Sequence, residues 1–269
     1  MKTDHAAVTF VTAVNNRAIL EANLLASPGL RENHAHELLI QEGYPSAAKA
    51  YNPAIARSAN DLMVFLHQDI YLPAGWMERL HSWISQLDRQ DPAWGVAGCW
   101  GTTQGGAGFG HVYSPGVGVL GTCFDDPQPV QALDEIVLIM RRSRGLRFDQ
   151  GLEHFHFYGA DLCLTAHSRG LRSYAISAFC VHNSNYQLVL PREFYTAYRY
   201  FKRKWRAELP VQTPCLRVSR FDRELRGRRM RELSHRLCGQ MVGQVRSDNP
   251  AGLYERLQSG SSPEFLKAQ

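Results

Sequence analysis

LMVFLHQDIYLPAGW, residues 62–76, is the stretch of sequence that decides the fold. It opens with five consecutive apolar residues, a length and composition typical of a strand buried on both faces of a sheet. The polar residues His67, Gln68 and Asp69 follow directly, at the carboxyl end of this predicted strand. Ligands of open α/β sheets bind beyond that end, so the stretch predicts both a central strand and the place of a site.

The side chains of His67 and Asp69 are two residues apart, so an extended chain would point both of them to the same side. A carboxylate at this place suits Mn²⁺ or Mg²⁺, which in turn would neutralise a diphosphate. The alternative is that Asp69 caps a helix predicted from residue 73 onward. The residues alone leave both interpretations open.

The segments around this strand alternate between strand and helix patterns. Strands are predicted at residues 6–14, 37–40 and 95–100, and helices at residues 17–26, 46–59 and 73–87. Pro53 interrupts the second helix, which predicts a kink or two short helices. The alternation favours βαβ units and a mostly parallel sheet flanked by helices, an α/β fold of the Rossmann-like kind.

The next part of the chain, residues 101–129, is rich in Gly and Pro and predicts a long loop. We expect residues 101–121 to act as a lid over a bound ligand. Strand character returns at residues 130–140 and again at residues 172–181, with a helix at residues 160–169 between them.

A second group of polar residues lies in FDQGLEHFHFYGADLCLTAHSRG, residues 148–170. Asp161 falls near the start of the predicted helix, where its carboxylate should stay ionised and could serve as a general base. It could equally be a helix N-cap. His154 and His156 either orient a substrate or lie on the surface. His182 ends a predicted strand, as a structural residue or as a ligand.

The positive charge of the chain is concentrated toward its C-terminal part. Residues 191–246 hold 15 Lys and Arg against 5 Asp and Glu, so this part carries about +10 and the rest about −5. The excess suggests an anionic partner such as membrane headgroups or an acidic glycan, or only a solvated helical face. Aromatic residues recur at helical spacing, which indicates packing against the body or an interfacial helix: Phe194, Tyr198, Phe201 and Trp205. No nucleic-acid-binding module is recognisable, so we expect no nucleic acid partner.

Cysteine usage and hydropathy bear on location. The six Cys residues form no C-x-x-C pair, which favours a reducing compartment over a disulfide framework or a zinc site. No apolar run reaches the roughly 18–20 residues that span a bilayer. We therefore expect a cytoplasmic protein, with peripheral contact at the inner face of an anionic membrane through the basic helices as the additional hypothesis.

Taken together, these motifs resemble a known family. The run SAAKAYNPAIARSANDLMVFLHQDIYLPAGW (residues 46–76) resembles the bacterial family-two-like glycosyltransferases of the GT-A fold, with H-Q-D as a shortened DXD motif. LDEIVLIMRR (residues 133–142) and residues 148–172 are similar to that family's acceptor-side strand and catalytic helix. VHNS (residues 181–184) is similar to its late strand-end histidine. The resemblance implies a GT-A catalytic domain over residues 1–190 and a basic helical extension over residues 191–269.

The resemblance also implies roles for individual residues. Asp69 and His182 would hold Mn²⁺ or Mg²⁺ on the diphosphate of a nucleotide sugar, and the base would be Asp161 with His156 as the alternative. The acceptor side would be formed by Asp134, Glu135 and His154. The donor side would be formed by Val14, Asn15, Gln41, Glu42, Asn52, His67 and Gln68. The implied reaction is an inverting transfer, from a UDP-sugar in the first place, to a hydroxyl of a glycan or glycoconjugate, as in bacterial polysaccharide biosynthesis.

Two departures from the family pattern keep other functions open. His67 stands where the fuller DXD motif has its first acid, and Tyr158-Gly159-Ala160 replace the paired acids of the E-D-x-D-L helix. One alternative is therefore a non-catalytic module of the same fold that binds a nucleotide or glycan. A nucleotidyltransferase fits less well, because VTAVNNRAIL follows the first strand where that class has a Gly-rich phosphate loop.

Overall fold

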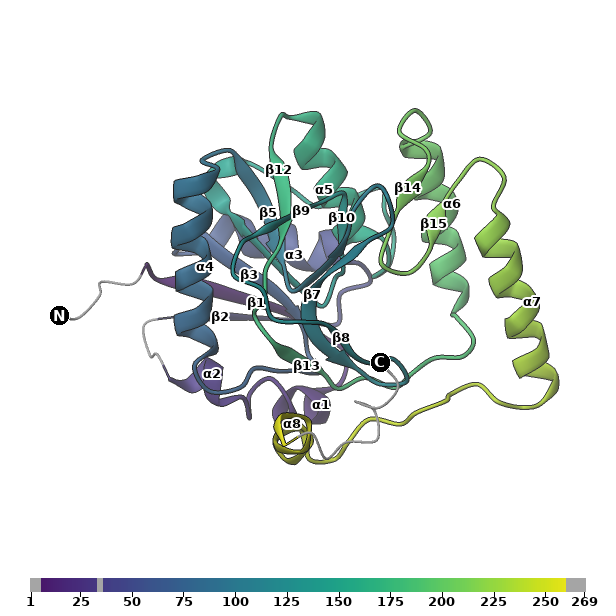
Figure 1. Ribbon diagram of the computed structural model, residues 1–269, viewed down its shortest axis with the longest axis horizontal. Coiled ribbons are helices and arrows are strands. Elements are labelled where there is room, and N and C mark those ends of the chain that lie inside the picture. Colours follow the sequence, from purple (N-terminus) through teal and green to yellow (C-terminus); the bar gives the residue numbers. More distant parts are fainter. Residues whose placement is uncertain (1–5, 33–35, 260–269) are drawn as a thin grey trace.

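The structure, a computed structural model, describes residues 6–32 and 36–259. A seven-stranded sheet in the order β2-β1-β3-β11-β5-β12-β9 forms the centre, with helices on both of its faces (Figure 1). Its strands are β1 (Val8–Val14), β2 (Glu37–Glu42), β3 (Leu62–His67), β5 (Trp94–Gly98), β9 (Gln128–Val130), β11 (Val137–Arg141) and β12 (Arg172–Ala175). The expected α/β architecture with flanking helices is confirmed.

The sheet is mixed, which corrects the expectation of a mostly parallel sheet. Strands β1, β2, β3, β5 and β12 share one direction, whereas β11 lies antiparallel between β3 and β5, and β9 lies antiparallel to β12. No helix lies between β5 and β11 in the chain, whereas parallel neighbours need a long crossover connection, usually a helix.

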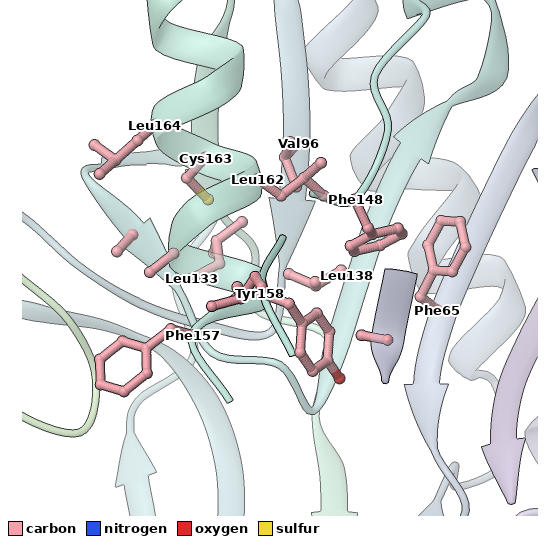
Figure 2. Close-up of a cluster of buried hydrophobic side chains, with 14 of the residues drawn as sticks. Phe65, Val96, Leu133, Leu138, Phe148, Phe157, Tyr158, Leu162, Cys163 and Leu164 are labelled. Atoms are coloured by element: carbon pink, nitrogen blue, oxygen red, sulfur yellow. The ribbon is translucent and has the colours of Figure 1, made fainter. Parts of the chain in front are cut away.

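The apolar run of β3 is explained by burial on both faces of the sheet. Met63 and Phe65 belong to one cluster, with α3 (Ala47–Arg57) and α5 (Tyr158–Ser168). Leu62, Val64 and Leu66 belong to the opposite cluster, with α1 (Arg17–Ala22), α2 (Pro28–Arg31) and α4 (Trp76–Gln90). Figure 2 shows part of the first cluster, in which Phe148 contacts the rings of both Phe65 and Tyr158.

Helix α3 is one continuous helix, so the break expected at Pro53 does not occur. Pro53 and Lys49 are both exposed. The carbonyl that loses its helical donor is that of Lys49, and water can satisfy it on this outer face. The buried face carries Tyr51 and small Ala side chains against the sheet.

A second sheet replaces the long loop that was predicted over residues 101–129, and that expectation is wrong. The second sheet has the order β10-β6-β7-β13-β4, with β8 paired to β7. Its strands are β4 (Ile70–Tyr71), β6 (Trp100–Thr102), β7 (Gly108–Ser114), β8 (Gly118–Gly121), β10 (Ala132–Leu133) and β13 (Cys180–His182). Val112, Tyr113 and Val119 are buried, and Gly116 makes the hairpin turn at φ +73. The glycines therefore mark turns between paired strands, and the segment offers no free lid.

Two predicted strands are divided in the structure. Residues 130–140 form β10 and β11 with a break at residues 134–136, and residues 172–181 form β12 and β13 in different sheets. A short 3₁₀ helix (Arg142–Arg144) follows β11. The first break holds Asp134 and Glu135, and the second carries the chain across to His182.

The C-terminal part begins with α6 (Arg192–Lys204), which packs into the core of the body. Phe194, Tyr198 and Phe201 are buried in the cluster that contains α5, and the rings of Phe157 and Phe201 are 5.2 Å apart. The packing interpretation of these aromatic residues is confirmed, and the core does not break at residue 190. The remaining elements are β14 (Val211–Gln212), β15 (Arg217–Val218), α7 (Arg223–Leu237) and α8 (Pro250–Gln258). Over residues 6–32 and 36–259, no helix combines the length and the apolar character needed to cross a bilayer.

Candidate functional site

His67, Asp69 and His182 come together at the edge of the molecule where β3 and β13 end. Strand β4 pairs with β13 so that Ile70 lies opposite His182, which sets Asp69 beside it. His182 Nε2 lies 3.5 Å from Asp69 Oδ1, and the ring centroids of His67 and His182 are 5.5 Å apart. One ligand atom from each of the three residues lies within 4.8 Å of the other two.

Electrostatics within this cluster follow from burial and mutual contact. The side chains of Asp69 and His182 are only 14% and 16% exposed. Burial opposes ionisation of Asp69, but His182, His67 and Arg246 outweigh it and hold the pKa of Asp69 well below its ordinary value. Burial also opposes protonation of His182, yet the Asp69 carboxylate raises the pKa of His182. Burial, reinforced by His182, lowers the pKa of His67.

The tautomer of His67 follows from its hydrogen bonds. The Tyr158 hydroxyl lies 3.0 Å from His67 Nε2 and donates to the backbone oxygen of Glu135 at 3.1 Å. A carbonyl oxygen can only accept, so when Tyr158 donates its proton there, the contact with His67 is satisfied by His67 Nε2–H donating to the Tyr158 oxygen. The lone pair of His67 is then on Nδ1. The hydrogen bond to Tyr158 at the other ring nitrogen orients the ring, as hydrogen bonds to metal-binding histidines do.

The donor set of this cluster fits a divalent metal ion. It comprises one carboxylate and two imidazoles. Within the described part of the chain, no other three His, Cys, Asp or Glu side chains lie close enough together to share an ion. Mg²⁺ prefers oxygen ligands, whereas imidazole nitrogen is acceptable to softer divalent ions. Of the two expected ions, the set therefore favours Mn²⁺.

Beside the cluster is a hollow of about 210 Å³. It is lined by Ala13, Val14, Asn15, Tyr44, Tyr51, His67, Gln68, Asp69 and Phe155. Gln68 Oε1 accepts hydrogen bonds from the backbone N–H groups of Asn15 and Asn16, both at 3.1 Å, and so ties the ends of β1 and β3 together. The structure thus brings together five of the residues expected here, and adds three aromatic rings that the sequence reasoning missed.

The other residues expected on the donor side have different surroundings. Gln41 is buried on β2 in register with Ala13, and its side-chain amide has no hydrogen-bond partner among the described residues. Glu42 pairs with Arg17 at 2.9 Å on the surface. The side-chain amide of Asn52 exchanges two hydrogen bonds with the backbone of Phe148, at 2.8 and 2.9 Å, which gives it a structural task.

The acceptor-side residues Asp134 and Glu135 lie in the break between β10 and β11. Asp134 Oδ1 caps the turn by accepting from Ile136 N at 3.1 Å. Burial, together with the charge of Asp134, raises the pKa of Glu135 to about 8, although Gly159 N donates to its carboxylate at 3.4 Å. Glu135 and His156 share the lining of a small hollow of about 20 Å³.

The two expected histidines of this region differ in environment. Burial and the neighbouring His67 and His154 lower the pKa of His156 to about 4, so the ring is neutral at physiological pH. His154 has a backbone at φ +66 and a side chain that is 38% exposed, and its carbonyl accepts from Ala47 N at 3.1 Å. His154 therefore contributes a backbone contact to the start of α3.

Asp161 lies inside the interface between α5 and α6. It is 2% exposed, and Lys204 Nζ donates to both of its oxygens, at 2.7 and 2.9 Å, while Trp205 Nε1 donates at 2.7 Å. Lys204 also pairs with Asp149 at 2.7 Å. Both oxygens of Asp161 are thus engaged within this interface.

Replacing Asp69 with Asn should remove Mn²⁺ binding at this site, because an amide lacks the charge that holds the ion between two imidazoles. We expect one Mn²⁺ per wild-type chain in an electron paramagnetic resonance titration of free Mn²⁺, and an affinity at least ~10-fold weaker in Asp69→Asn. Asp126→Asn, an exposed acid elsewhere on the surface, is the control and should bind as the wild type does. Equal Mn²⁺ binding in Asp69→Asn would contradict the assignment.

Comparisons with known proteins found one curated relative and several solved structures that resemble this chain. A protein named "ATP synthase subunits region ORF 6" from Fuscovulum blasticum is 29% identical over 163 residues, which are 58% of this chain and 64% of that protein, just under two thirds of its length. Among solved structures, the mannosyltransferase PcManGT from Pyrobaculum calidifontis, in complex with GDP-Man and Mn²⁺, is 12% identical with a TM-score of 0.48, covering 98% of this chain and 83% of that one. TarS 1–349 from S. aureus, in complex with UDP, is 13% identical with a TM-score of 0.46, covering 74% of this chain and 65% of that one.

The family itself is established by sequence. The model of a family described as "Glycosyltransferase like family" matches residues 9–201, which include every strand of the central sheet except the first residue of β1, and all of α5. The match extends over well over half of the chain and takes in the His67–Asp69–His182 cluster. The chain therefore belongs to the glycosyltransferase-like family, and its mixed α/β sheet with flanking helices is the GT-A fold that the resemblance implied.

Proposed function

We propose that this protein transfers a sugar from a nucleoside-diphosphate sugar, with UDP as the expected nucleotide, to a hydroxyl of a glycan or glycoconjugate acceptor. The observation that carries the proposal is the hollow lined by Asn15, Gln68 and aromatic rings, with the His67–Asp69–His182 cluster at its side. Such a hollow suits a flat base and ribose next to a place for a charged diphosphate.

The donor side supplies both stacking and hydrogen bonding. Tyr44 and Phe155 can contact a base through their ring faces, and the buried Tyr51 adds to the lining of the hollow. The amide of Gln41 points to the same sheet face as Ala13, with which it is in register, and both its donor and its acceptor are unused. A buried amide without partners is unfavourable by roughly 1–3 kcal/mol, and the complementary edge of a base would relieve that penalty.

The chemistry we propose is a single displacement with inversion at the anomeric carbon. A divalent ion at the cluster would supply charge neutralisation for the departing diphosphate. The acceptor oxygen forms its bond to the anomeric carbon as the bond to the diphosphate oxygen breaks. The acceptor proton passes to the Glu135 carboxylate, whose raised pKa makes it a stronger base than an exposed acid. Neutral His156 lies in the same hollow and can orient the acceptor hydroxyl.

The donor class can be identified by the thermal stability of the protein with UDP, GDP and TDP, each with Mn²⁺, with Mg²⁺ and with EDTA. We expect UDP with Mn²⁺ to raise Tm, because a ligand at a hundredfold excess over its Kd stabilises the folded state by about 2.7 kcal/mol. Release of free UDP from a panel of UDP-sugars then tests turnover. A shift without any turnover would favour the non-catalytic binding module, and no shift with any nucleotide would overturn the proposal.

Glu135→Gln should lower kcat by roughly 10²–10⁴-fold, the range that general-base assistance supplies. Nucleotide affinity should stay unchanged, because the amide oxygen can still accept from Gly159 N. In the wild type, kcat/KM should rise with pH and level off above about 8, since only the ionised carboxylate takes the proton.

Asp161→Asn is the matched comparison for Glu135→Gln. It removes one of the two carboxylates that pair with Lys204 at a buried contact, so we expect a lower Tm. Turnover by the folded protein should be retained. Full turnover in Glu135→Gln combined with loss in Asp161→Asn would return the base to Asp161.

We also propose that the protein is cytoplasmic and lies against an anionic membrane through α7. Met230, Leu233 and Leu237 recur at helical spacing on α7 and are 68%, 51% and 81% exposed. Six arginines flank them on the same helix: Arg223, Arg226, Arg228, Arg229, Arg231 and Arg236. Apolar side chains bordered by basic ones are typical of a helix that lies in a membrane interface. Figure 1 shows α7 at the outer margin of the molecule.

Co-sedimentation with phosphatidylserine-containing vesicles tests this surface. Binding should be strong at 0.1 M NaCl and weak at 1 M, because the screening length falls from about 10 Å to about 3 Å. Replacing Met230, Leu233 and Leu237 with Ser should weaken binding at least ~10-fold through lost apolar burial. Val117→Ser is the control, because Val117 is 47% exposed and lies in the turn between β7 and β8. Equal pelleting with neutral vesicles, or none with anionic ones, would overturn the membrane proposal.

A further inference from the structure

After α7 the chain returns to the edge of the molecule that holds the His67–Asp69–His182 cluster. Residues 241–247, here called the return segment, run antiparallel to residues 185–188 (Figure 1). Leu188 N donates to Met241 O at 3.1 Å, Gly243 N to Tyr186 O at 2.9 Å, and Tyr186 N to Gln244 O at 2.8 Å. The return segment lies outside the family match at residues 9–201, so the family pattern assigns it no role.

The return segment is fixed to the residue that follows His182. Asn183 is fully buried, its side chain donates to Ser247 O at 2.8 Å, and it accepts from Ser247 N at 2.8 Å. Asn185 Oδ1 accepts from Arg246 N at 2.9 Å. Beyond this clamp, α8 buries Leu253 and Leu257 against Phe179 and Val181 of the second sheet. The backbone of Arg246 is therefore held by bonds on both sides.

Arg246 lies near enough to the cluster for its charge to act there, because its segment is hydrogen-bonded to Asn183 and Asn185, which follow His182. Its positive charge acts on both Asp69 and His182, where it favours the carboxylate and disfavours the protonated imidazole. Among the described residues no carboxylate forms an ion pair with Arg246, and its Nη1 is buried without a hydrogen-bond partner. A buried guanidinium donor left unpaired is unfavourable, which points to a ligand that is bound there.

We propose that Arg246 binds the diphosphate of the donor, beside the Asp69–His182 pair. This inference rests on the proposed function. A guanidinium presents two parallel N–H groups that match phosphate oxygens, and such contacts are stronger than those of neutral donors. The diphosphate gains a further negative charge as its bond to the sugar breaks and then carries more than one divalent ion neutralises, so a second cation at this place balances the departing group. Arg246 thus acts on the leaving group, and Glu135 acts on the acceptor.

The variants Arg246→Gln and Arg246→Lys test the assignment, with Arg256→Gln as the control because Arg256 is exposed on the following helix α8. Affinities are measured by calorimetry with Mn²⁺ for two pairs of probes, UDP with UMP and GDP with GMP. Arg246→Gln should weaken the affinity for the diphosphates by roughly 10–100-fold, the range of a charge-assisted contact. It should weaken the affinity for the monophosphates far less. Arg246→Lys keeps the positive charge but lacks the two parallel N–H groups, so its diphosphate affinity should lie between those of the wild type and Arg246→Gln. Arg256→Gln should bind both kinds of nucleotide as the wild type does.

The outcomes separate this inference from the proposed function. Wild-type diphosphate affinity in Arg246→Gln would overturn the role of Arg246 and leave the donor site standing. Absence of nucleotide binding in the wild type would overturn both. Tm without nucleotide shows whether each variant is folded, and if Arg246→Gln is not, Arg246→Lys decides. A folded Arg246→Lys with unchanged preference for diphosphate over monophosphate would show that the fork is not used, against the proposal.

Discussion

Two residue pairs between β4 and β13 hold the functional edge of this protein together. Val181 lies opposite Tyr71 and His182 opposite Ile70, and Asn183 N extends the ladder by donating to Asp69 O at 2.8 Å. More than a hundred residues of chain separate the two strands, so closing this contact has a substantial entropic cost. Burial of Ile70, Tyr71 and Val181 in the apolar clusters offsets it. The position of Asp69 against His182, and the attachment of the return segment to Asn183, both depend on this short ladder.

The start of α5 shows how the fold accommodates the loss of the family's paired acids. A side chain at position 159 would place its Cβ 2.8 Å from Leu133 O, so an acid could stand there only if the backbone moved. The carboxylate that lies against this position instead comes from Glu135, in the break between β10 and β11. Tyr158 fills the preceding position and links His67 to the same turn. The His67–Asp69–His182 cluster and the turn that holds Glu135 are thus joined through one hydroxyl group.

Much of the central sheet could be predicted from local pattern, and much of the edge could not. The run at residues 62–66 alternates between two buried faces, and burial on both faces is what a continuous apolar strand indicates. The resemblance placed Asp69 and His182 in one cluster, and the structure has them in contact. The second sheet was missed because its strands are short and its glycines, such as Gly116, resemble loop composition. Tyr158, Tyr51 and Arg246 gave no local signal, since each acts through contacts with residues far away in sequence.

The return segment and α8 also bear on how the protein is made. Chains fold progressively during synthesis, at about 5–20 residues per second, and N-terminal regions fold first. Residues 9–201 contain the His67–Asp69–His182 cluster and Glu135, so these residues are synthesised before the return segment. Until residues 241–258 emerge, Asn183 lacks Ser247, and Phe179 and Val181 lack their cover from Leu253 and Leu257. Translation therefore imposes an order in which the part of the edge formed by the return segment is completed several seconds after the rest.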